Sequence, residues 1–352
     1  MWFNIRIVFD SGKHNIYNLY AKKASKGAKY EMMSDAVIIV TGGSGFIGSN
    51  LLDFLSDAEF AFGKTRIISI DKREPDFKLP NIEYVTADLS KPDFHYVGQK
   101  PEAVIHLAGY PWSKVKGDQG WLAEADDCFQ NNTVATYNVL SKIRPNKIIF
   151  SSTANLYGEG RKLKEDAPKQ ISSPYGYSKW VAEEVIRKSG IEYIIFRFGT
   201  VVGKRGRTFP SRLVYSAIHN LPVDLFYKGE AYRDLISVDD ICRALTSAFF
   251  FPKNSDLKWS DNTYNVSMGM EISGAILAET VAKKAKEYGY ELTYKLADYA
   301  PNGFVKESTL SINKIHRQIG WEPQVKLDDL VDTLFKYYEE PDAKEPPTWE
   351  SL

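Results

Sequence analysis

The chain has 352 residues, of which 43% are hydrophobic and 26% are charged. This length suffices for one large α/β unit or for two lobes that share a cleft. Lysine plus arginine and aspartate plus glutamate each number 45, so the formal net charge is zero. A balanced charge excludes a long-range attraction to nucleic acid or to an anionic membrane. An anionic ligand must therefore be held by a few local basic side chains.

The chain contains two cysteines, Cys128 and Cys242, which are far apart and lie in apolar, helix-like sequence. We predict two buried free thiols rather than a disulfide, which suits a reducing cytosol. No apolar run approaches the roughly 20 residues of a membrane span. Asp10, Lys13 and His14 interrupt the N-terminus where a signal peptide has its apolar segment. We therefore expect no export signal and a cytoplasmic protein.

The two ends of the chain differ from its middle. Residues 1–34 are rich in lysine toward their end, and the first strong strand pattern begins at residue 36. We expect residues 1–34 to be a poorly ordered extension, and a short strand over residues 4–9 is the alternative. The tail, residues 339–352, carries prolines and acids and is expected to be loosely attached.

From residue 36 to about residue 200, short apolar runs alternate with longer helical patterns. Continuous runs rich in valine and isoleucine are typical of strands buried on both faces of a parallel sheet. Strands that alternate with helices predict an α/β protein with a Rossmann-type, doubly wound parallel sheet. The expected strands are Val37–Val40, Arg66–Ile70, Ile82–Val85, Ala103–Leu107, Lys147–Phe150 and Tyr193–Phe196.

After about residue 203 this rhythm loosens, and a basic loop begins at Gly203. We predict a dinucleotide-binding domain over residues 35–203, to which residues 232–250 return. Residues 204–338 are expected to form mainly a smaller C-terminal substrate-binding lobe.

A glycine-rich turn directly follows the first expected strand. Thr41–Gly48 reads TGGSGFIG and opens an amphipathic helix. Gly42, Gly45 and Gly48 let the chain turn tightly and bring backbone N–H groups close to a pyrophosphate, and the helix N-terminus adds partial positive charge. Because these glycines have the required strand–turn–helix context, they predict a dinucleotide-binding site.

Asp71 ends the second expected strand, 23 residues beyond Gly48. An acid at this place accepts hydrogen bonds from an adenosine ribose and disfavours a 2′-phosphate, so NAD is favoured as the cofactor. Two alternatives stay open: Lys72 and Arg73 attract that phosphate, or Asp71 merely ends a strand. Further candidates for the cofactor site lie in the turn and at the ends of the later strands, namely Phe46, Ile47, Asp88, Leu89, Leu107, Ala108, Gly109 and Ser151.

Tyr175 and Lys179 lie four residues apart and share one face of a helix that begins near Pro174. A free tyrosine has a pKa of about 10 and is a poor base at neutral pH. A nearby ammonium and a positive nicotinamide ring favour the phenolate, and Lys179 can also hold the nicotinamide ribose. Thr153, at the end of the fifth expected strand, faces the ligand crevice and completes the predicted catalytic trio. His106 is expected to be a packed structural histidine.

Five motifs together resemble one family. Their combination resembles the extended short-chain dehydrogenase/reductases, and more narrowly the NAD-dependent nucleotide-sugar epimerase/dehydratase branch, from about residue 36 to residue 335. The resemblance implies a Rossmann-type lobe that holds NAD, a smaller lobe that holds a nucleoside-diphosphate sugar, and a homodimer through paired helices. The motifs are TGGSGFIG at Thr41–Gly48, HLAG at His106–Gly109, SSTANLYG at Ser151–Gly158, PYGYSK at Pro174–Lys179 and RDLISVDD at Arg233–Asp240.

The resemblance also implies roles for single residues. The three predicted catalytic residues match the catalytic trio of the family. Asn132 matches a helix asparagine of the active-site framework, and we place it in the cofactor site. Arg233 matches an arginine that contacts the nucleotide phosphates, a task that suits its charged fork. A salt bridge from Arg233 to Asp234 or Asp239 is the alternative. No metal is expected.

Two departures from the family pattern concern the phosphate end of the substrate site. Thr200 stands where these epimerases usually have an asparagine, and Pro301–Gly303 contains no arginine where many members have a second one. Arg205, Arg207 or Lys306 are candidates to supply the missing charge. Thr200 and Arg207 are therefore included among the expected substrate-binding residues.

The two residues after Thr153 separate the members of this branch. Dehydratases usually carry an acid there, because elimination of water needs an additional acid and base. Ala154 and Asn155 occupy these positions, so dehydration is disfavoured. We expect epimerisation at C4 of a UDP-hexose, in which hydride passes to NAD and returns to the other face of a 4-keto sugar. A reductase of 4-keto nucleotide sugars that uses NADH or NADPH is the alternative, and a non-catalytic dinucleotide sensor comes third.

Overall fold

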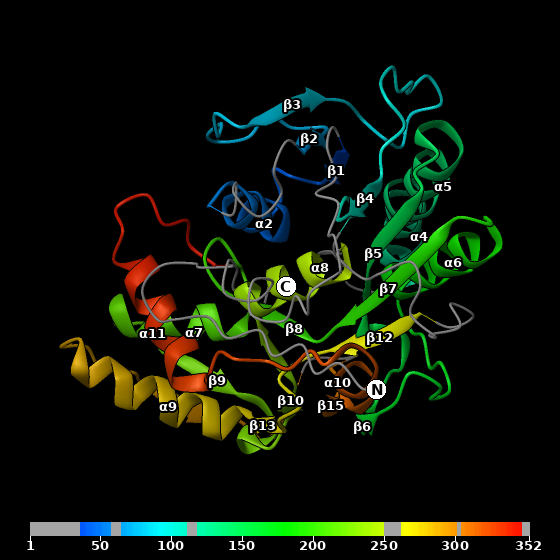
Figure 1. Cartoon of the computed structure of the whole chain (residues 1–352). Helices are drawn as coiled ribbons and strands as arrows, with labels where there is room; N and C mark the ends of the chain where they lie inside the picture. Colours follow the sequence, from blue (N-terminus) through cyan, green and yellow to red (C-terminus); the bar gives the residue numbers. More distant parts are fainter. Residues whose placement is uncertain (1–35, 58–64, 111–117, 250–261, 301–303, 347–352) are drawn as a thin grey trace, which may run out of the picture.

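The computed structural model of the chain describes residues 36–57, 65–110, 118–249, 262–300 and 304–346 (Figure 1). Its central sheet has seven strands, which are β1 (Val37–Thr41), β2 (Arg66–Asp71), β3 (Ile82–Thr86), β4 (Ala103–His106), β5 (Lys147–Thr153), β7 (Glu192–Phe198) and β12 (Thr263–Val266). Their order is β12-β7-β5-β4-β1-β2-β3, and every neighbouring pair is parallel. The predicted Rossmann-type sheet is thus confirmed.

The strand order reverses between β1 and β4, since the chain winds outward from β1 in one direction and from β4 in the other. Strands β1, β4 and β5 are buried over their whole length. Ile38 and Val40 pack in one hydrophobic cluster, whereas Val37 and Ile39 pack in another on the opposite face of the sheet. This alternation places apolar side chains on both faces, and ligands bind outside the carboxyl ends of the strands at such a reversal.

Helices cover both faces of the sheet. On one face lie α2 (Phe46–Asp57) and α8 (Val238–Phe249), which pack against each other. Figure 1 shows α4 (Asp118–Cys128), α5 (Ala135–Asn138) and α6 (Pro174–Lys188) together on the other side. Two π-helical turns, η1 (Phe129–Val134) and η2 (Val139–Ile143), continue α4 and α5.

The remaining elements gather beyond the carboxyl end of the sheet (Figure 1). Four short strands form a second sheet in the order β13-β10-β15-β6, and two strand pairs, β11-β8 and β14-β9, lie apart from it. The bounds are β6 (Gly160–Leu163), β8 (Thr200–Val202), β9 (Val223–Leu225), β10 (Tyr232–Arg233), β11 (Leu235–Ser237), β13 (Ile272–Ser273), β14 (Tyr294–Leu296) and β15 (Glu307–Leu310). Helices and 3-10 turns are η3 (Ala154–Leu156), α7 (Phe209–Ile218), η4 (Phe226–Gly229), α9 (Gly274–Glu287), α10 (Asn313–Ile319) and α11 (Leu327–Tyr338).

Strand β12 belongs to the central sheet, although it lies within residues 204–338, which we assigned mainly to the substrate-binding lobe. Thr263 and Asn265 interrupt the apolar run that marked the other strands, so the pattern was not visible in the sequence. The remaining domain boundaries stay a prediction. The expected extension, residues 1–34, and the end of the tail lie outside the described residues.

Both cysteines are buried and free, as predicted. Among the helices that the structure describes, none has the length and apolar character needed to cross a bilayer.

Candidate active site

The glycine-rich turn joins β1 to α2 and forms one wall of a cleft of about 560 Å³. Gly42 has a φ of +75°, which favours glycine. A Cβ atom on Gly42 would lie 2.6 Å from the backbone nitrogen of Ala108, and a Cβ atom on Gly48 would lie 2.1 Å from the carbonyl oxygen of Gly42. Since neither position has room for a side chain, the turn presents bare backbone and the N-terminus of α2 to the cleft, an arrangement that binds phosphates.

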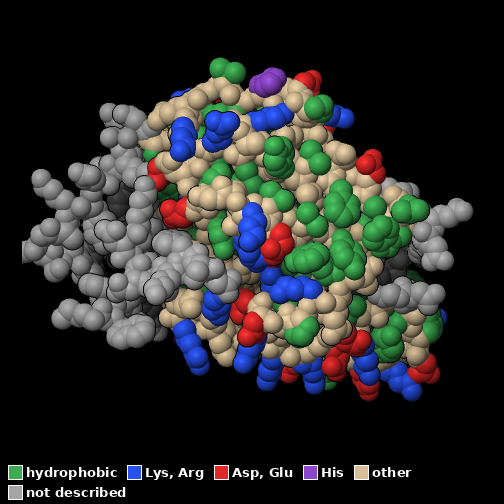
Figure 2. All heavy atoms as spheres, turned by 90° about the vertical axis from the view of Figure 1, so that its right-hand side faces the viewer, with side chains coloured by type: hydrophobic (Ala, Val, Ile, Leu, Met, Phe, Trp, Pro, Cys, Tyr) green, Lys and Arg blue, Asp and Glu red, His purple; other side chains and the backbone are tan. Residues whose placement is uncertain are grey.

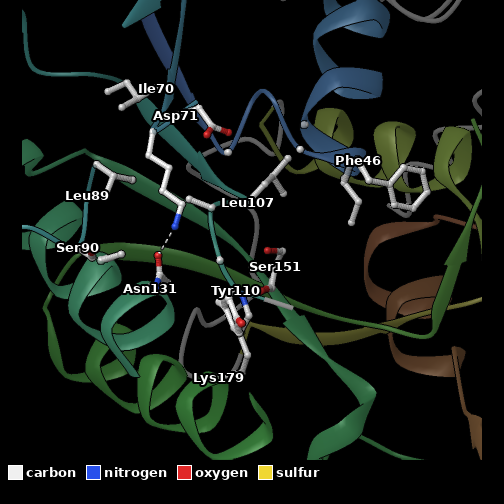
Figure 3. Close-up of a pocket in the computed structure, with 18 of the residues that line it drawn as sticks. Phe46, Ile70, Asp71, Leu89, Ser90, Leu107, Tyr110, Asn131, Ser151 and Lys179 are labelled. Atoms are coloured by element: carbon white, nitrogen blue, oxygen red, sulfur yellow. Dashed lines mark hydrogen bonds between the residues drawn. The ribbon is translucent and has the colours of Figure 1, made fainter. Parts of the chain in front are cut away.

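Asp71 lies at one end of the cleft, and Ser151 and Lys179 lie toward the other (Figure 3). The Asp71 carboxylate accepts hydrogen bonds from the backbone nitrogens of Ser44 and Arg73, both at 3.0 Å. It therefore does more than end a strand, and the turn holds it at the cleft wall.

Two cations follow Asp71 and also line the cleft. Lys72 Nζ donates to Asn131 Oδ1 at 2.8 Å (the dashed line to Asn131 in Figure 3), and Arg73 Nη2 donates to the Ser44 carbonyl oxygen at 3.2 Å. Each cation is thus bound to an oxygen of the protein. Because Lys72 and Arg73 are already hydrogen-bonded, the carboxylate of Asp71 is the group left to recognise a ribose, and it suits a ribose with free hydroxyl groups, as in NAD.

The opposite end of the cleft brings the predicted catalytic trio together. Thr153 comes from the last position of β5, whereas Tyr175 and Lys179 come from the first turns of α6, and all three line the cleft. Helix α6 begins here because Pro174 occupies its first turn and the Ser173 hydroxyl accepts a hydrogen bond from the Gly176 nitrogen at 3.1 Å. The Tyr175 hydroxyl is hydrogen-bonded to Thr153.

The protonation of this pair depends on burial. Burial raises the pKa of Tyr175 to about 12, although its hydrogen bond with Thr153 lowers it in part. Burial lowers the pKa of Lys179 to about 8, against the opposing charge of Glu183. Lys179 Nζ donates to the Ser151 carbonyl oxygen at 2.9 Å and lies 4.7 Å from the centre of the Phe150 ring. At neutral pH, Lys179 is thus an ammonium beside a phenol that needs further positive charge to ionise.

His106 is the structural histidine that the sequence predicts. Burial, followed by the charge of Lys179, lowers the pKa of His106 to about 3, so the ring is neutral. Its two nitrogens are hydrogen-bonded to the hydroxyls of Thr41 and Thr136, at 2.6 and 3.0 Å.

Asn132 lies behind the cleft wall and does not line the cleft. Its buried amide accepts a hydrogen bond from the Tyr110 nitrogen at 2.7 Å and donates to the Ser178 hydroxyl at 2.8 Å, so it ties the segment after β4 to α6. Asn132 Oδ1 lies 2.8 Å from the place of a Cβ atom on the lining residue Gly109, and its part in the cofactor site stays a prediction. The other predicted cofactor residues do line the cleft: Gly42, Gly45, Phe46, Ile47, Gly48, Asp71, Asp88, Leu89, Leu107, Ala108, Gly109, Ser151, Tyr175 and Lys179.

The cleft also has lining residues that no motif marked. Tyr110 and Asn131 belong to this group, and so do Ser90 and Val201. Ser90 and Tyr110 come within a few residues of a strand end, where a count from each strand would have reached them, whereas Asn131 and Val201 belong to later elements and carried no local signal.

Of the four predicted substrate-binding residues, Thr153 lines this cleft, and Thr200 stands between the lining residues Gly199 and Val201. Thr200 lies on β8, where its nitrogen donates to the Asp234 carbonyl oxygen at 2.9 Å. Arg207 is exposed. Arg233 lies on β10 in the second sheet.

Arg233 is held by carbonyl oxygens and an aromatic ring. Its guanidinium donates to Tyr232 O at 2.9 Å, to Lys306 O at 3.2 Å and to Val305 O, and lies 4.7 Å from the centre of the Phe304 ring. Burial lowers its pKa to about 10.

Arg233 forms no salt bridge with Asp234 or Asp239, so this alternative is wrong. Among the described residues, no carboxylate pairs with Arg233 within 4.0 Å. Asp239 is exposed. The buried Asp234 accepts hydrogen bonds from Ser267 Oγ and from the nitrogens of Gly269 and Leu310, at 2.9 to 3.1 Å. Among the described residues no carboxylate is thus ion-paired with the guanidinium, although the negative charge of Glu159 acts on it and raises its pKa in part.

A parallel sheet with a glycine turn at its reversal point, and with a Tyr–Lys pair at the far end of the cleft, defines a Rossmann-type dinucleotide-binding protein of the dehydrogenase/reductase class. Residues 38–266 match the model of the NAD dependent epimerase/dehydratase family. A putative UDP-glucose 4-epimerase of Methanocaldococcus jannaschii is 30% identical, over 86% of this chain and 98% of its own. The chain therefore belongs to the NAD-dependent epimerase/dehydratase family, as its motifs predict.

Two further relatives have names that agree with this family. A UDP-glucose 4-epimerase of Azospirillum brasilense is 28% identical, over 85% of this chain and 91% of its own. The crystal structure of UDP-glucose 4-epimerase with UDP-glucose from Thermotoga maritima has a TM-score of 0.70 and 26% identity, and the match covers 86% of this chain and 98% of that one.

Proposed function

We propose that this chain catalyses NAD-dependent epimerisation at C4 of a UDP-hexose, through transient oxidation to the 4-keto sugar. The observation that carries the proposal is the placement of Thr153, Tyr175 and Lys179 together on the cleft that the glycine turn opens. The relatives named as UDP-glucose 4-epimerases, one of them solved with UDP-glucose, support the choice of substrate.

The residues of the cleft fit NAD. A Cβ atom would fill the space at Gly42 and Gly48, the N-terminus of α2 faces that space, and Asp71 lies where a ribose is recognised. When bound, NAD supplies the acceptor for one hydride.

The catalytic trio supplies the proton transfer. Lys179 holds the ribose hydroxyls and, as an ammonium, favours the Tyr175 phenolate. Tyr175 removes the proton from the sugar 4-hydroxyl and later returns it to the same oxygen, while Thr153 hydrogen-bonds that oxygen. Ala154 and Asn155 carry no acid beside Thr153, so the site offers no group for elimination of water.

The direct test is incubation of the purified protein with UDP-glucose and, separately, with UDP-galactose, without added nicotinamide. We expect both reactions to reach the same mixture of the two sugars. Absence of interconversion across a panel of nucleotide sugars would exclude the epimerase. Consumption of NADH with a 4-keto substrate alone would instead establish the reductase.

For the phosphates of the sugar nucleotide, we propose Arg233 together with Lys306. The two residues are neighbours, because Arg233 donates to the Lys306 carbonyl oxygen. The Lys306 ammonium lies 5.6 Å from the centre of the Tyr227 ring and 3.6 Å from Glu230. Arg205 is less suitable, since it pairs with Asp53 at 2.8 Å. Thr200 and Arg207 stay candidate contacts.

Replacement of Arg233 by leucine should raise KM for the UDP-sugar about 10- to 100-fold with little change in kcat, because a charge-assisted hydrogen bond to phosphate contributes about 1.5 to 3 kcal/mol. Lys306→Met should raise KM by a smaller factor. Steady-state kinetics over a range of substrate concentrations measures both effects. Arg205→Met is the control and should keep the native KM; an equal rise in this control would remove Arg233 and Lys306 as phosphate ligands.

We propose a homodimer formed through α4 and α6, which pack against each other. Trp121 and Leu122 on α4 and Tyr177 and Trp180 on α6 are large, exposed and apolar. The Trp121 and Tyr177 rings meet edge to face, with centres 6.3 Å apart. Figure 2 looks onto the side of the molecule that carries these helices and shows hydrophobic side chains gathered there. A shared apolar patch of this kind supports burial against a second copy.

Sedimentation should give twice the chain mass of 39.9 kDa. Trp180→Glu should shift the protein toward the monomer, because it would bury a charge in the interface. Val97→Glu, at an exposed apolar residue outside the two helices, should leave the mass unchanged. A monomeric native protein contradicts the proposal.

We also propose a cytoplasmic location, which the two buried free thiols support. Recovery of the protein in an exported fraction after cell fractionation would contradict it.

A further inference from the structure

A row of buried polar residues crosses the central sheet beneath the catalytic trio. Ser152 on β5, Arg197 on β7 and Asn265 on β12 stand next to one another in the strand register. All three are buried, and Arg197 is 1% exposed. The buried interior of a parallel sheet is usually built from valine, isoleucine and leucine, and the chemistry proposed above uses none of these three residues. A polar row at this position therefore requires its own explanation.

Two residues of this row, Ser152 and Arg197, are hydrogen-bonded to Glu183, a fully buried carboxylate on α6. Its Oε1 accepts hydrogen bonds from Ser152 Oγ at 2.5 Å and from Arg197 Nε at 2.9 Å. Its Oε2 accepts from Arg197 Nη2 at 2.7 Å and from Arg187 Nη2 at 2.8 Å. Burial pushes the pKa of Glu183 upward, but the hydrogen bonds and charge of Arg197 outweigh it and hold the pKa below its usual value. Glu183 is thus a carboxylate anion inside the protein.

The remaining guanidinium nitrogen of Arg197, Nη1, is not hydrogen-bonded to Glu183 and has other partners. Its Nη1 donates to the Tyr157 hydroxyl at 2.7 Å and to the Glu165 carbonyl oxygen at 2.9 Å. The Tyr157 hydroxyl donates to Asn265 Oδ1 at 2.7 Å. Both carboxylate oxygens of Glu183 and all three guanidinium nitrogens of Arg197 therefore have hydrogen-bond partners. Through these contacts Glu183 connects α6 to β5, β7 and β12.

Glu183 also completes a repeated contact between α6 and β5. Tyr175, Lys179 and Glu183 follow one another at four-residue spacing along one face of the helix. Each of them is hydrogen-bonded to one of the last three residues of β5. Tyr175 pairs with Thr153, and Lys179 donates to the Ser151 carbonyl oxygen. Glu183 accepts a hydrogen bond from the Ser152 hydroxyl. A displacement of Glu183 would therefore move the catalytic pair relative to Thr153.

We propose that Glu183, held by Arg197 and Ser152, is a positioning residue for the catalytic pair: it fixes the register of α6 on β5 and keeps Lys179 charged. The inference rests on the proposed roles of Tyr175 and Lys179. The negative charge of Glu183 raises the pKa of Lys179. Groups from four elements surround the Lys179 ammonium. Its own helix contributes Tyr175 and Glu183, and β5 contributes the Ser151 carbonyl oxygen and the Phe150 ring. The neutral His106 lies on β4, and Asn132 on η1 lies close to Gly109, as the Lys179 ammonium also does.

The test is the pH dependence of kcat in Glu183→Gln, which keeps the shape of the side chain and removes its charge. In the native enzyme, kcat should fall above a pH near 8, where Lys179 loses its proton. Without the negative charge the ammonium is less favoured, so the pKa of Lys179 falls and this alkaline limb should move about one unit to lower pH. With a one-unit shift, kcat should drop about twofold at pH 7 and approach a tenfold drop above pH 8, with KM nearly unchanged.

Two matched variants separate charge from packing. Glu184→Gln changes the next residue on the helix, whose half-exposed side chain pairs with Arg187 at 2.5 Å, and should leave the alkaline limb and kcat unchanged. Glu183→Asp keeps the charge but shortens its reach, so kcat should fall while the limb stays near its native pH. A purely structural residue would lower the melting temperature in Glu183→Gln without moving the limb, and that result would overturn the proposal.

Glu183→Gln leaves Arg197 as a buried cation without a carboxylate, which is strongly destabilising. If the single variant does not fold, Glu183→Gln with Arg197→Met removes both charges and should show the same shift of the limb. Tyr175→Phe distinguishes the two proposals. Full activity of Tyr175→Phe would overturn the proposed function. An inactive Tyr175→Phe, together with an unshifted alkaline limb in Glu183→Gln, would overturn the positioning role alone.

Discussion

Replacement of Tyr175 by phenylalanine should lower kcat about a thousandfold and leave NAD bound in the purified protein. In the proposed mechanism the phenol exchanges a proton with the sugar 4-hydroxyl, and a positioned acid–base group contributes about 10² to 10⁴ in rate. The ring itself should stay in place, because Tyr175 lies in the first turn of α6 and the substitution removes only its hydroxyl. The measurement is kcat with UDP-glucose, together with the NAD released on denaturation.

Tyr177→Phe is the matched control. This tyrosine lies two residues further along α6, on the exposed side of the helix. Its variant should keep native kcat. Native kcat in Tyr175→Phe as well would mean that the chain uses another base, whereas no turnover in the native protein would point to a dinucleotide sensor.

Gly48→Ala should leave the protein with at least tenfold less bound NAD. A Cβ atom at Gly48 would lie 2.1 Å from the Gly42 carbonyl oxygen and 2.8 Å from its carbonyl carbon, so the turn must open to accommodate it. Such overpacking costs about 1 to 3 kcal/mol, and the displaced backbone no longer presents its N–H groups to the pyrophosphate. The amount of NAD per chain and the melting temperature measure the two effects.

Gly190→Ala is the control for Gly48→Ala. Gly190 has a φ of +73°, but no atom lies within 4 Å of the place where its Cβ would be. The control should lose a little stability from its backbone conformation and keep its NAD. Native NAD content in Gly48→Ala would show that the turn does not cradle the cofactor.

The sequence predicted the sheet and most of the cofactor wall because their signals are local. A valine- and isoleucine-rich run, a glycine turn and a helix start follow one another within the first segment of the fold, and the Tyr175–Lys179 spacing is a property of a single helix. Asp71 could be placed because it directly ends a strand. The family assignment rested on these same motifs and is confirmed by the comparisons.

The remaining features depend on contacts between distant parts of the chain. Ser152 and Glu183 are 31 residues apart, and Tyr157 and Asn265 are 108 residues apart. Their pairing follows from strand order, which spacing along the chain does not reveal. Asn131 lines the cleft, whereas its predicted neighbour Asn132 lies behind it, and a one-residue difference on a π-helical turn is not visible in sequence.

The position of β12 has a consequence for how this protein can be divided. Beyond β7 the chain leaves the central sheet, builds α7, β9, β10 and α8, and only then returns to place β12 along the outer edge of β7. A fragment that stops at residue 203 would lack this strand and would leave β7 with an open row of backbone donors and acceptors, which invites aggregation. It would also lose α8, which covers the face of the sheet beside α2. The dinucleotide-binding unit is therefore discontinuous in sequence, and its independent folding requires α8 and β12, which lie within residues 204–338.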